Sequence, residues 1–305
     1  MATNRPTDLK DFVGQDNLKP LIQGIIETCN KTHKPWPHTL CFGPPGVGKT
    51  TLSQCVNSGL DGYTFISLTA SRDWTPDTLR RILLDLPIEG YSKVTNNGAW
   101  IPGAPKYMVF IDEIGELKND VWVSVMLNCM EDGELHIGAV TSWLPELSIF
   151  ASTTDPYRIP SAGLSRFGLQ LHLQPYSVTD LEAIIGRIYP SLDAALRQEV
   201  AKRSRGIARL ALSFAEGVSD HGLSFFDILG VDSEGLNELD RKYISALEGA
   251  KGASMALGTI ANIVCENAKT LQTFVEPELQ RLGMLEINAH GRSLKSTGRG
   301  SKYRE

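Results

Sequence analysis

The sequence is poor in the residues that would crosslink it or hold a structural metal. Its five cysteines are spread over 305 residues with no C-x-x-C pair, and its six histidines are equally scattered. Zinc sites and small disulfide scaffolds both need closer and more regular spacing than this. The sequence therefore predicts reduced, mostly buried thiols of the kind found in cytoplasmic proteins.

Long apolar runs and an export signal are lacking as well. No apolar run approaches the roughly 20 residues that a membrane span requires. The N-terminal segment MATNRPTDLKDF has no apolar signal core, so we expect neither export nor a membrane partner. With 42% hydrophobic and 21% charged residues the composition is that of an ordinary soluble protein, and a length of 305 residues predicts two or three domains.

Positive charge is outnumbered overall but concentrated at one end of the chain. The net charge is −5, yet residues 281–305 carry six cations against two acids, which leaves −9 on the preceding 280 residues. A basic tail on an acidic body favours contact with a polyanion. A solvated tail is an equally good interpretation of the composition.

What the chain does contain is a complete phosphate-binding motif. It reads Gly43-Pro44-Pro45-Gly46-Val47-Gly48-Lys49-Thr50-Thr51, a full match to G-x-x-x-x-G-K-[ST], between an apolar strand pattern and a helical pattern. Glycines let consecutive backbone N–H groups approach phosphate oxygens, and the helix N-terminus adds a partial positive charge. We expect Lys49 to reach the β- and γ-phosphates of a nucleoside triphosphate and the Thr50 hydroxyl to ligate Mg²⁺. A glycine turn that merely carries a lysine is the competing interpretation, and the flanking patterns disfavour it.

Two strand ends carry polar residues that could complete this site. The apolar run 107–111 ends in Asp112 and Glu113, and the run 147–152 is followed by Thr153-Thr154. In open α/β sheets the ligand lies at the carboxyl ends of the strands. We expect Asp112 to hold the Mg²⁺ hydration shell, Glu113 to orient and polarise the attacking water, and Thr154 to read the γ-phosphate. The competing interpretations are a helix-capping acidic pair and a simple strand terminator.

The hydrophobic period changes to 3.6 from Ser177 onward. A compact all-α unit is predicted by amphipathic helical patterns at 178–189, 193–202 and 207–218. Three more helical patterns, at 236–247, 255–264 and 268–282, are followed by a short basic hairpin at 284–295. This order predicts a winged-helix module. Earlier in the chain, segment 86–106 predicts a long surface loop, which either touches nucleic acid or is a solvated insertion.

These motifs together resemble the RuvB family of AAA+ motors, which drive branch migration of Holliday junctions. The likeness runs nearly end to end, and its most telling stretches are Gly43–Thr51, Phe110–Ile114, Arg166-Phe167-Gly168, Arg203-Ser204-Arg205-Gly206 and Gly235-Leu236…Asp240-Arg241-Lys242. It implies an α/β fold: an AAA+ P-loop NTPase domain with a parallel sheet over 1–175, an all-α lid over 176–231 and a C-terminal winged-helix domain over 232–305. It further implies ATP and Mg²⁺ as cofactors, and a homo-oligomer that forms a hexameric ring around duplex or branched DNA.

The resemblance also implies roles for particular residues. It assigns Arg5 to the nucleotide site, and it places Phe12 and Val13 in a segment, Phe12 to Gln15, that borders the adenine. It assigns Thr154 as sensor 1 and Arg209 as sensor 2. Arg166 would be the arginine finger that reaches the γ-phosphate of a neighbouring subunit, which makes hydrolysis depend on assembly. The DNA phosphates would be contacted by cations of the winged helix, namely Arg292, Lys295 and Arg299.

Several positions depart from the family pattern. Leu164 stands where the family usually has an arginine, Ile207-Ala208 replaces a usual Thr-Pro, and the hairpin at 135–147 is shorter. In the family that hairpin docks the junction-recognising partner RuvA, so this partnership is left open, with Trp143 and Leu144 as an apolar tip for some partner. The departures indicate a divergent member, such as one encoded by a phage or mobile element. Two functions are retained: a motor that remodels Holliday junctions in recombination and repair, and a loader or switch that assembles on DNA without processive translocation.

Overall fold

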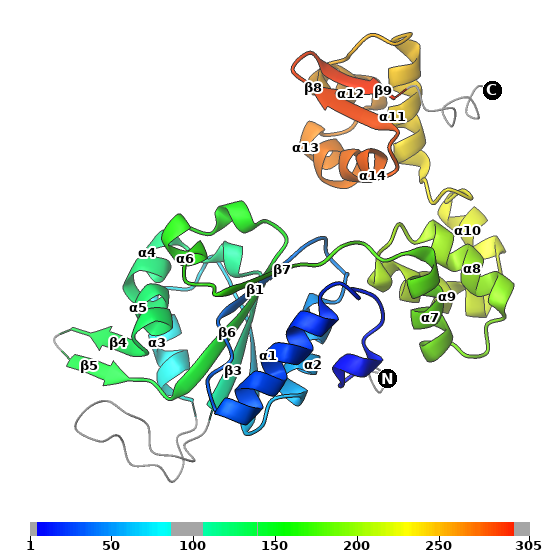
Figure 1. Cartoon of the computed structure of the whole chain (residues 1–305). Helices are drawn as coiled ribbons and strands as arrows, with labels where there is room; N and C mark the ends of the chain where they lie inside the picture. Colours follow the sequence, from blue (N-terminus) through cyan, green and yellow to red (C-terminus); the bar gives the residue numbers. More distant parts are fainter. Residues whose placement is uncertain (1–4, 87–105, 139, 296–305) are drawn as a thin grey trace. The chain divides into compact units, whose positions relative to one another are not determined.

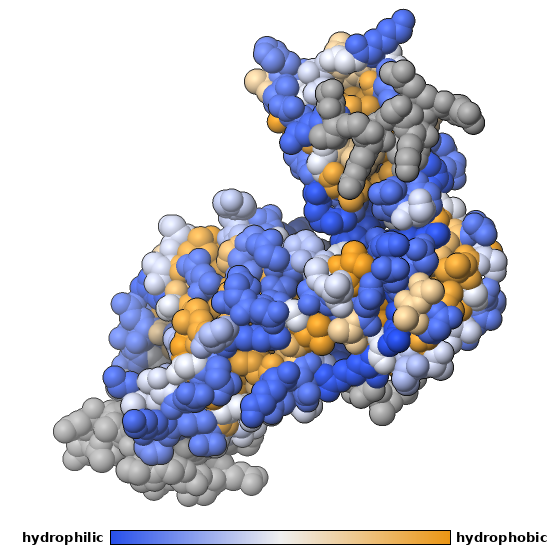
Figure 2. Space-filling model, turned by 45° about the vertical axis from the view of Figure 1, so that its right-hand side comes forward, coloured by the Kyte–Doolittle hydropathy of each residue, from blue (hydrophilic) through white to orange (hydrophobic). Residues whose placement is uncertain are grey.

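The computed structural model describes residues 5–86, 106–138 and 140–295. The chain divides into two compact units, of which the first holds residues up to Ile184 together with Ile207–Arg209, and the second holds Ile185–Gly206 and the chain from Leu210 onward. No helix among the described residues is long and apolar enough to cross a membrane. On the face that Figure 2 shows, hydrophilic residues predominate over the described surface and apolar side chains form separate patches.

The first unit is built on a five-stranded parallel sheet with the strand order β2-β3-β6-β1-β7 (Figure 1). Its strands are β1 (Thr39–Phe42), β2 (Tyr63–Thr69), β3 (Lys106–Asp112), β6 (Glu146–Thr153) and β7 (Leu169–His172). The three inner strands consist almost entirely of buried residues, as expected for a parallel sheet covered on both faces. β1 lies between the central strand β6 and the outer strand β7, so its carboxyl end lies beside that of β6 at the edge where ligands bind in such folds.

Helices cover both faces of this sheet (Figure 1). On one side lie α1 (Lys19–Thr32) and α2 (Lys49–Ser58); on the other lie α3 (Pro76–Leu84), α4 (Asn119–Val121), the π-turn η3 (Trp122–Met126) and α5 (Leu127–Glu131). Short elements complete the unit: η1 (Leu9–Asp11), η2 (Ile114–Glu116), η4 (Pro156–Arg158), α6 (Ser161–Leu164) and the first part of α7 (Val178–Ile188). Trp122 is fully buried in the core beneath α3 to α5, with Leu79 and Leu83 of the amphipathic α3. This core fixes the sheet edge that carries the predicted site.

A separate two-stranded hairpin, β4 (Glu134–Ile137) and β5 (Val140–Trp143), precedes β6. Leu144, predicted as part of an apolar tip, is only 2% exposed and belongs to the core of the first unit. Trp143 is 39% exposed, and Val140 on the same strand is 65% exposed. Ile137 of β4, which pairs with Val140, is 42% exposed, so the outward apolar surface of the hairpin comes from both strands and excludes Leu144.

The second unit is helical and ends in a small antiparallel hairpin. Its elements are α8 (Ala194–Arg203), most of α9 (Ala208–His221), α10 (Ser224–Leu229), α11 (Glu238–Gly249), α12 (Leu257–Val264), α13 (Ala268–Thr270), the π-turn η5 (Leu271–Val275), α14 (Glu276–Arg281), β8 (Leu285–Asn288) and β9 (Gly291–Leu294). The elements α13, η5 and α14 follow one another without a break, so the predicted third helix of the module is present. Around them, α11, α12 and the hairpin share one apolar core that includes Tyr243, Ile260 and Leu271. The predicted winged-helix architecture is confirmed.

Candidate functional site

The phosphate loop connects β1 to α2 and has a backbone that only glycine can adopt at its key positions. Gly43 has φ +147°, and a Cβ added there would lie 2.4 Å from the Leu173 carbonyl oxygen. Gly48, the residue before α2, has φ +96°, and a Cβ added there would lie 2.9 Å from the Tyr176 hydroxyl and 3.3 Å from the ring of Phe12. The loop is therefore held closely against its neighbours, and the free N–H groups of the first turn of α2 lie at its end.

Lys49 is folded into this loop. The side chain is buried, and its Nζ donates to the carbonyl oxygens of Gly43 at 2.9 Å and Pro44 at 3.0 Å. Burial lowers the pKa of Lys49, and the nearby Arg209 charge lowers it further, against the opposing influence of Cys41, Glu113 and Asp112. The ammonium group thus lies among loop carbonyls, with weaker solvation than a surface lysine has. A polyphosphate in the loop would supply the negative charge that this site favours.

Asp112 is the last residue of β3 and Glu113 follows it, as predicted, at the same edge of the sheet. Asp112 accepts hydrogen bonds from the Ser152 hydroxyl of the adjacent strand and, at 3.1 Å, from the Glu113 backbone N–H. Glu113 has φ +51°, a left-handed conformation that is uncommon outside glycine and that often marks functional residues. One carboxylate at the end of β3 and one hydroxyl at the start of α2 suit Mg²⁺, which is usually held by one or two side chains and the phosphates of its nucleotide. The residues present therefore fit a Mg²⁺–nucleotide complex, in which Asp112 and Thr50 would be the protein contacts.

Thr154 emerges from the sheet between the phosphate loop and the acidic pair. In the parallel register Phe42 pairs with Thr153, so Thr154 is level with the first glycine of the loop. Its side chain is exposed, whereas that of Thr153 is buried and hydrogen-bonds the backbone of Asp155. The structure thus brings Thr154, and not its neighbour, to the open edge.

The predicted site residues of the N-terminal segment lie in two different parts of the first unit. Phe12 is 3% exposed, and its ring lies 3.3 Å from the position of a Cβ on Gly48, while Gly14 packs on the ring of Tyr176. Val13, between them, is half-buried. Arg5 lies elsewhere in the unit, along a cavity of about 300 Å³ whose other lining residues are Thr7, Gln54, Asn57 and Phe65. Phe12 is therefore beside the phosphate loop, with Val13 next to it in the chain, and Arg5 lies along the side of α2.

Tyr176 is a site residue that sequence reasoning missed. Its hydroxyl donates to the Val47 carbonyl oxygen at 2.9 Å, from a buried position that raises the pKa of the phenol, so the hydroxyl stays a donor at any physiological pH. No short-range pattern marks it, because its partner lies 129 residues away in the chain. The only available signal was an aromatic residue directly before the first helix of the lid.

Arg209 reaches the phosphate loop through its backbone. Its N–H donates to the Gly46 carbonyl oxygen at 3.2 Å, and its Cβ and the side chain of Ile207 both lie within 3 Å of where a Cβ on Gly46 would be. The Arg209 side chain itself is exposed. The segment 207–209 is consequently packed on the loop, which accounts for its place in the first unit.

Arg166 has its contacts in another part of the first unit. Its guanidinium forms an ion pair with Glu131 at the end of α5 and donates to the Ala162 carbonyl oxygen of α6 at 2.9 Å. Its Nε is buried and has no hydrogen-bond partner among the residues that the structure describes. The structure therefore does not bring Arg166 to the phosphate loop of its own chain.

The three predicted DNA contacts have different positions. The Arg292 guanidinium donates to Glu276 at 2.9 and 3.4 Å, and the Tyr243 hydroxyl donates to the same carboxylate at 2.8 Å. Glu276 is 2% exposed, and its hydrogen bonds to Arg292 raise the pKa of that arginine. The Arg292 guanidinium is thus engaged in an ion pair within the winged helix, with 18% of its side chain exposed. Lys295 is exposed after β9, whereas Arg299 lies outside the described residues, as does most of segment 86–106.

Comparison with known proteins agrees with this architecture. The first part of the chain, residues 4–73, matches the Holliday junction DNA helicase RuvB P-loop domain, and residues 233–303 match the RuvB C-terminal winged helix domain. Residues 39–175 match the AAA family of ATPases associated with various cellular activities.

Individual relatives align along almost the whole chain. The Holliday junction branch migration complex subunit RuvB of Nitratiruptor sp. is 31% identical, over 95% of this chain and 89% of the relative. That of Campylobacter fetus is 31% identical over 96% and 87%. A solved structure of the Thermotoga maritima RuvB Holliday junction branch migration motor superposes with a TM-score of 0.77 at 28% identity, and a point mutant of it superposes with 0.79; each comparison covers 96% of both chains. The chain belongs to the RuvB family of AAA ATPases.

Proposed function

We propose that this protein is an ATP-driven motor that assembles as a hexameric ring on duplex DNA and drives branch migration of Holliday junctions. The observation that carries the proposal is that one chain joins a P-loop facing an acidic pair to a winged-helix module, in the order found in RuvB. A two-part chain of this kind can couple nucleotide turnover to a grip on DNA.

The chemistry at the first unit follows from the positions of its side chains. Lys49 and the loop N–H groups hold the β- and γ-phosphates of ATP, and Glu113 orients and polarises a water for in-line attack on the γ-phosphorus. Asp112 and Thr50 would hold Mg²⁺, which when bound neutralises charge on the β- and γ-phosphate oxygens. Thr154, level with the loop, donates to the γ-phosphate and registers its loss. Because phosphoryl transfer needs positioning and charge stabilisation more than covalent chemistry, these residues suffice for slow hydrolysis.

Fast hydrolysis requires a cation from a neighbouring chain in this proposal. Arg166 leaves Glu131 and reaches the γ-phosphate of the adjacent subunit, which is worth about 10³–10⁵ in rate for an arginine finger. Arg209 reports the state of the nucleotide to the lid, since its backbone already binds the phosphate loop. Hydrolysis therefore depends on ring assembly.

The grip on DNA is electrostatic and independent of sequence. Lys295 and cations beyond the described residues, including Arg299, contact phosphates, and affinity falls as salt rises. Lys295→Ala should weaken binding to all duplexes alike and reduce the salt slope by about 1. Arg292→Ala should instead lower the stability of the winged helix, because it leaves Glu276 buried and unpaired.

The experiment that tests the proposal is branch migration of a synthetic four-way junction, with and without a RuvA-type protein. Lys49→Ala should abolish ATP binding, and Glu113→Gln should bind ATP but stall. Arg166→Ala should bind ATP yet lose turnover. Mixing the last two variants should restore ATPase activity, because one site in the mixed ring then has both an intact Glu113 and a neighbour's Arg166. If the mixture stays inactive, the finger does not act between subunits.

A loader or switch that assembles on DNA without processive translocation is the second candidate. The same active-site residues serve it, and the half-exposed Trp143 on a short hairpin leaves room for an adaptor other than RuvA. Sustained DNA-stimulated turnover with junction movement supports the motor. A single ATP-gated cycle of DNA binding supports the loader.

A further inference from the structure

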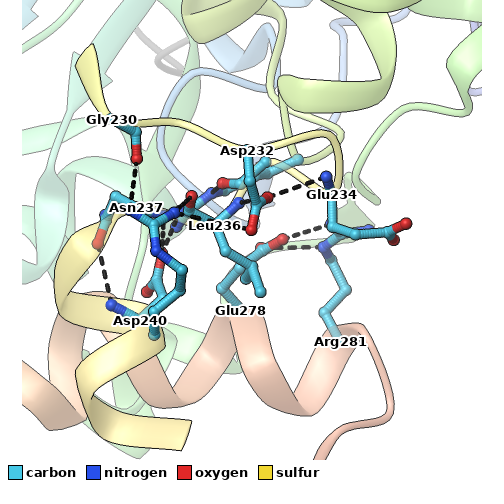
Figure 3. A network of polar contacts seen from close by, with 11 residues as sticks. Gly230, Asp232, Glu234, Leu236, Asn237, Asp240, Glu278 and Arg281 are labelled. Atoms are coloured by element: carbon cyan, nitrogen blue, oxygen red, sulfur yellow. Dashed lines mark hydrogen bonds and ion pairs between the residues drawn. The ribbon is translucent and has the colours of Figure 1, made fainter. Parts of the chain in front are cut away.

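The connection between the lid and the winged helix, residues Gly230–Leu236, has the composition of a flexible linker but is tightly held. Two of its seven residues are glycines, and both have positive φ, +63° at Gly230 and +81° at Gly235. Asp232 organises the turn by accepting, at 2.9 Å, from the backbone N–H groups of Glu234 and Leu236 (Figure 3). We call this segment the junction.

Arginines from both flanking domains bind the carbonyl groups of the junction. From α11, Arg241 donates to the carbonyl oxygens of Leu236 at 2.8 Å and Gly230 at 2.9 Å. From the C-terminal side of α8, Arg203 donates to Val231 at 3.3 Å and Arg205 donates to Gly235 at 2.8 Å. Exposed linkers leave such carbonyls to water, so this set of bonds marks an ordered connection.

Arg205 also crosses from the lid into the winged helix. The Arg205 guanidinium forms an ion pair with Asp240, which is fully buried at the start of α11. The Arg205 side chain is only 13% exposed. The same Asp240 oxygen accepts from the Asn237 backbone N–H at 2.9 Å, within the capping box of α11 (Figure 3). Asp240 thereby joins the first turn of the winged helix to the lid.

The backbones themselves approach closely at this place. A Cβ on Gly235 would lie 2.7 Å from the Arg203 carbonyl oxygen, so a side chain at Gly235 would push the two segments apart. On the other side of the junction, the Arg203 guanidinium lies 4.4 Å from the ring centroid of Phe226 in α10. The lid residues from Ile185 to Gly206 accordingly belong to the same compact unit as the winged helix.

We infer that the junction makes the lid and the winged helix one rigid body, with Arg205 as the residue that positions one on the other. This inference rests on the proposed motor function for its purpose. Four residues after Arg205, the backbone of Arg209 binds the phosphate loop at Gly46. A change of the loop with nucleotide is therefore passed through this short segment to the lid, and the junction carries it on to the DNA-binding module without loss in a flexible hinge.

Rigidity is measured by electron-spin distance measurements on the full chain, diluted with unlabelled protein. One label is attached to Cys265, the exposed cysteine among the described residues, and the other to Ser219→Cys on the exposed side of α9. We expect one narrow distance distribution that is the same with ADP and with a non-hydrolysable ATP analogue. Arg205→Gln should broaden it at least twofold. A broad or nucleotide-dependent distribution in the parent, or an unchanged one in Arg205→Gln, overturns the inference.

The functional arm compares Arg205→Gln with Lys242→Gln, which breaks an exposed ion pair to Glu238 on the same helix α11. Arg205→Gln should keep nucleotide affinity, basal ATPase activity and DNA affinity within about twofold. It should lose at least tenfold in Holliday junction branch migration per ATP hydrolysed. Lys242→Gln should keep all four. Arg205→Lys, which retains the charge on Asp240, should recover part of the coupling. Normal Holliday junction branch migration by a folded Arg205→Gln chain overturns the inference. A parent chain that moves no Holliday junction refutes the motor function instead, and the distance measurement alone then tests whether the lid and the winged helix form one rigid body.

Discussion

Replacing Tyr176 by phenylalanine tests whether a buried hydroxyl shapes the phosphate loop. The substitution keeps the ring that packs on Gly14 and removes one oxygen, the donor to the Val47 carbonyl at 2.9 Å. Nothing else in the loop changes directly. Any effect therefore measures the hydrogen bond and not the packing.

The magnitude follows from what the Val47 carbonyl loses. A buried acceptor left without a partner costs about 1–3 kcal/mol, and a water that enters to replace the hydroxyl brings the cost toward the lower end. We therefore expect Tyr176→Phe to destabilise the first unit by about 1–2 kcal/mol. The loop can instead avoid this cost by adopting conformations that do not bind ATP. ATP binding must then restore the binding conformation, so the affinity for ATP falls by a free energy of at most about 1–2 kcal/mol, which is about 5- to 30-fold.

Denaturant unfolding and equilibrium binding of a fluorescent ATP analogue measure the two quantities. Tyr157→Phe is the matched control, because Tyr157 lies in the same unit and is 94% exposed. The control should leave both the unfolding midpoint and the dissociation constant unchanged. If Tyr176→Phe equals Tyr157→Phe in both measurements, the hydroxyl does not support the loop and its assignment to the site is wrong.

Three further outcomes are expected at the same site. Burial holds the pKa of Lys49 below its ordinary value of 10.5, and phosphates restore it; ATP binding at alkaline pH should thus take up protons and weaken as pH rises through the lowered pKa, which calorimetry in buffers of different ionisation enthalpy detects as a buffer-dependent heat. Gly43→Ala should abolish ATP binding because its Cβ meets a backbone oxygen at 2.4 Å, whereas Gly62→Ala, which has a positive φ but open space, should only lower stability; equal binding by both variants contradicts this. Glu131→Gln should free Arg166 and lower the protein concentration for half-maximal ATPase activity, and an unchanged or higher concentration would show that the ion pair does not restrain the finger.

The fold and the core of the site could be predicted from sequence because their signals are local. The phosphate loop is a contiguous motif, and its glycines stand where the backbone has positive φ. Asp112 and Glu113 end a continuous apolar run, and that run is a buried inner strand of the sheet. Parallel strands then bring such ends to one edge without any further information.

The parts that escaped prediction are pairings between distant residues. Tyr176 acts on Val47 across 129 positions, and Arg205 on Asp240 across 35. Neither residue differs in type or local pattern from tyrosines and arginines that have no such partner. The motifs around Arg205 and Asp240 pointed to the family, but their physical purpose became visible only when the structure placed one carboxylate, fully buried, against one guanidinium.

The number of cations near the C-terminus overstates the charge that is free to bind DNA, because some of these cations form ion pairs within the winged helix. Among the described residues from 281 to 295 there are three cations, and two of them are engaged within the winged helix: Arg281 with Glu278, and Arg292 with the nearly fully buried Glu276. A buried carboxylate needs its partner, so the Arg292 charge is fixed by folding before any DNA arrives. Lys295 is the cation of this stretch without an ion pair in the described part of the chain. We therefore expect the proposed attraction for DNA to depend on Lys295 and on the three cations that follow it in the sequence, Arg299, Lys302 and Arg304, more than on Arg292.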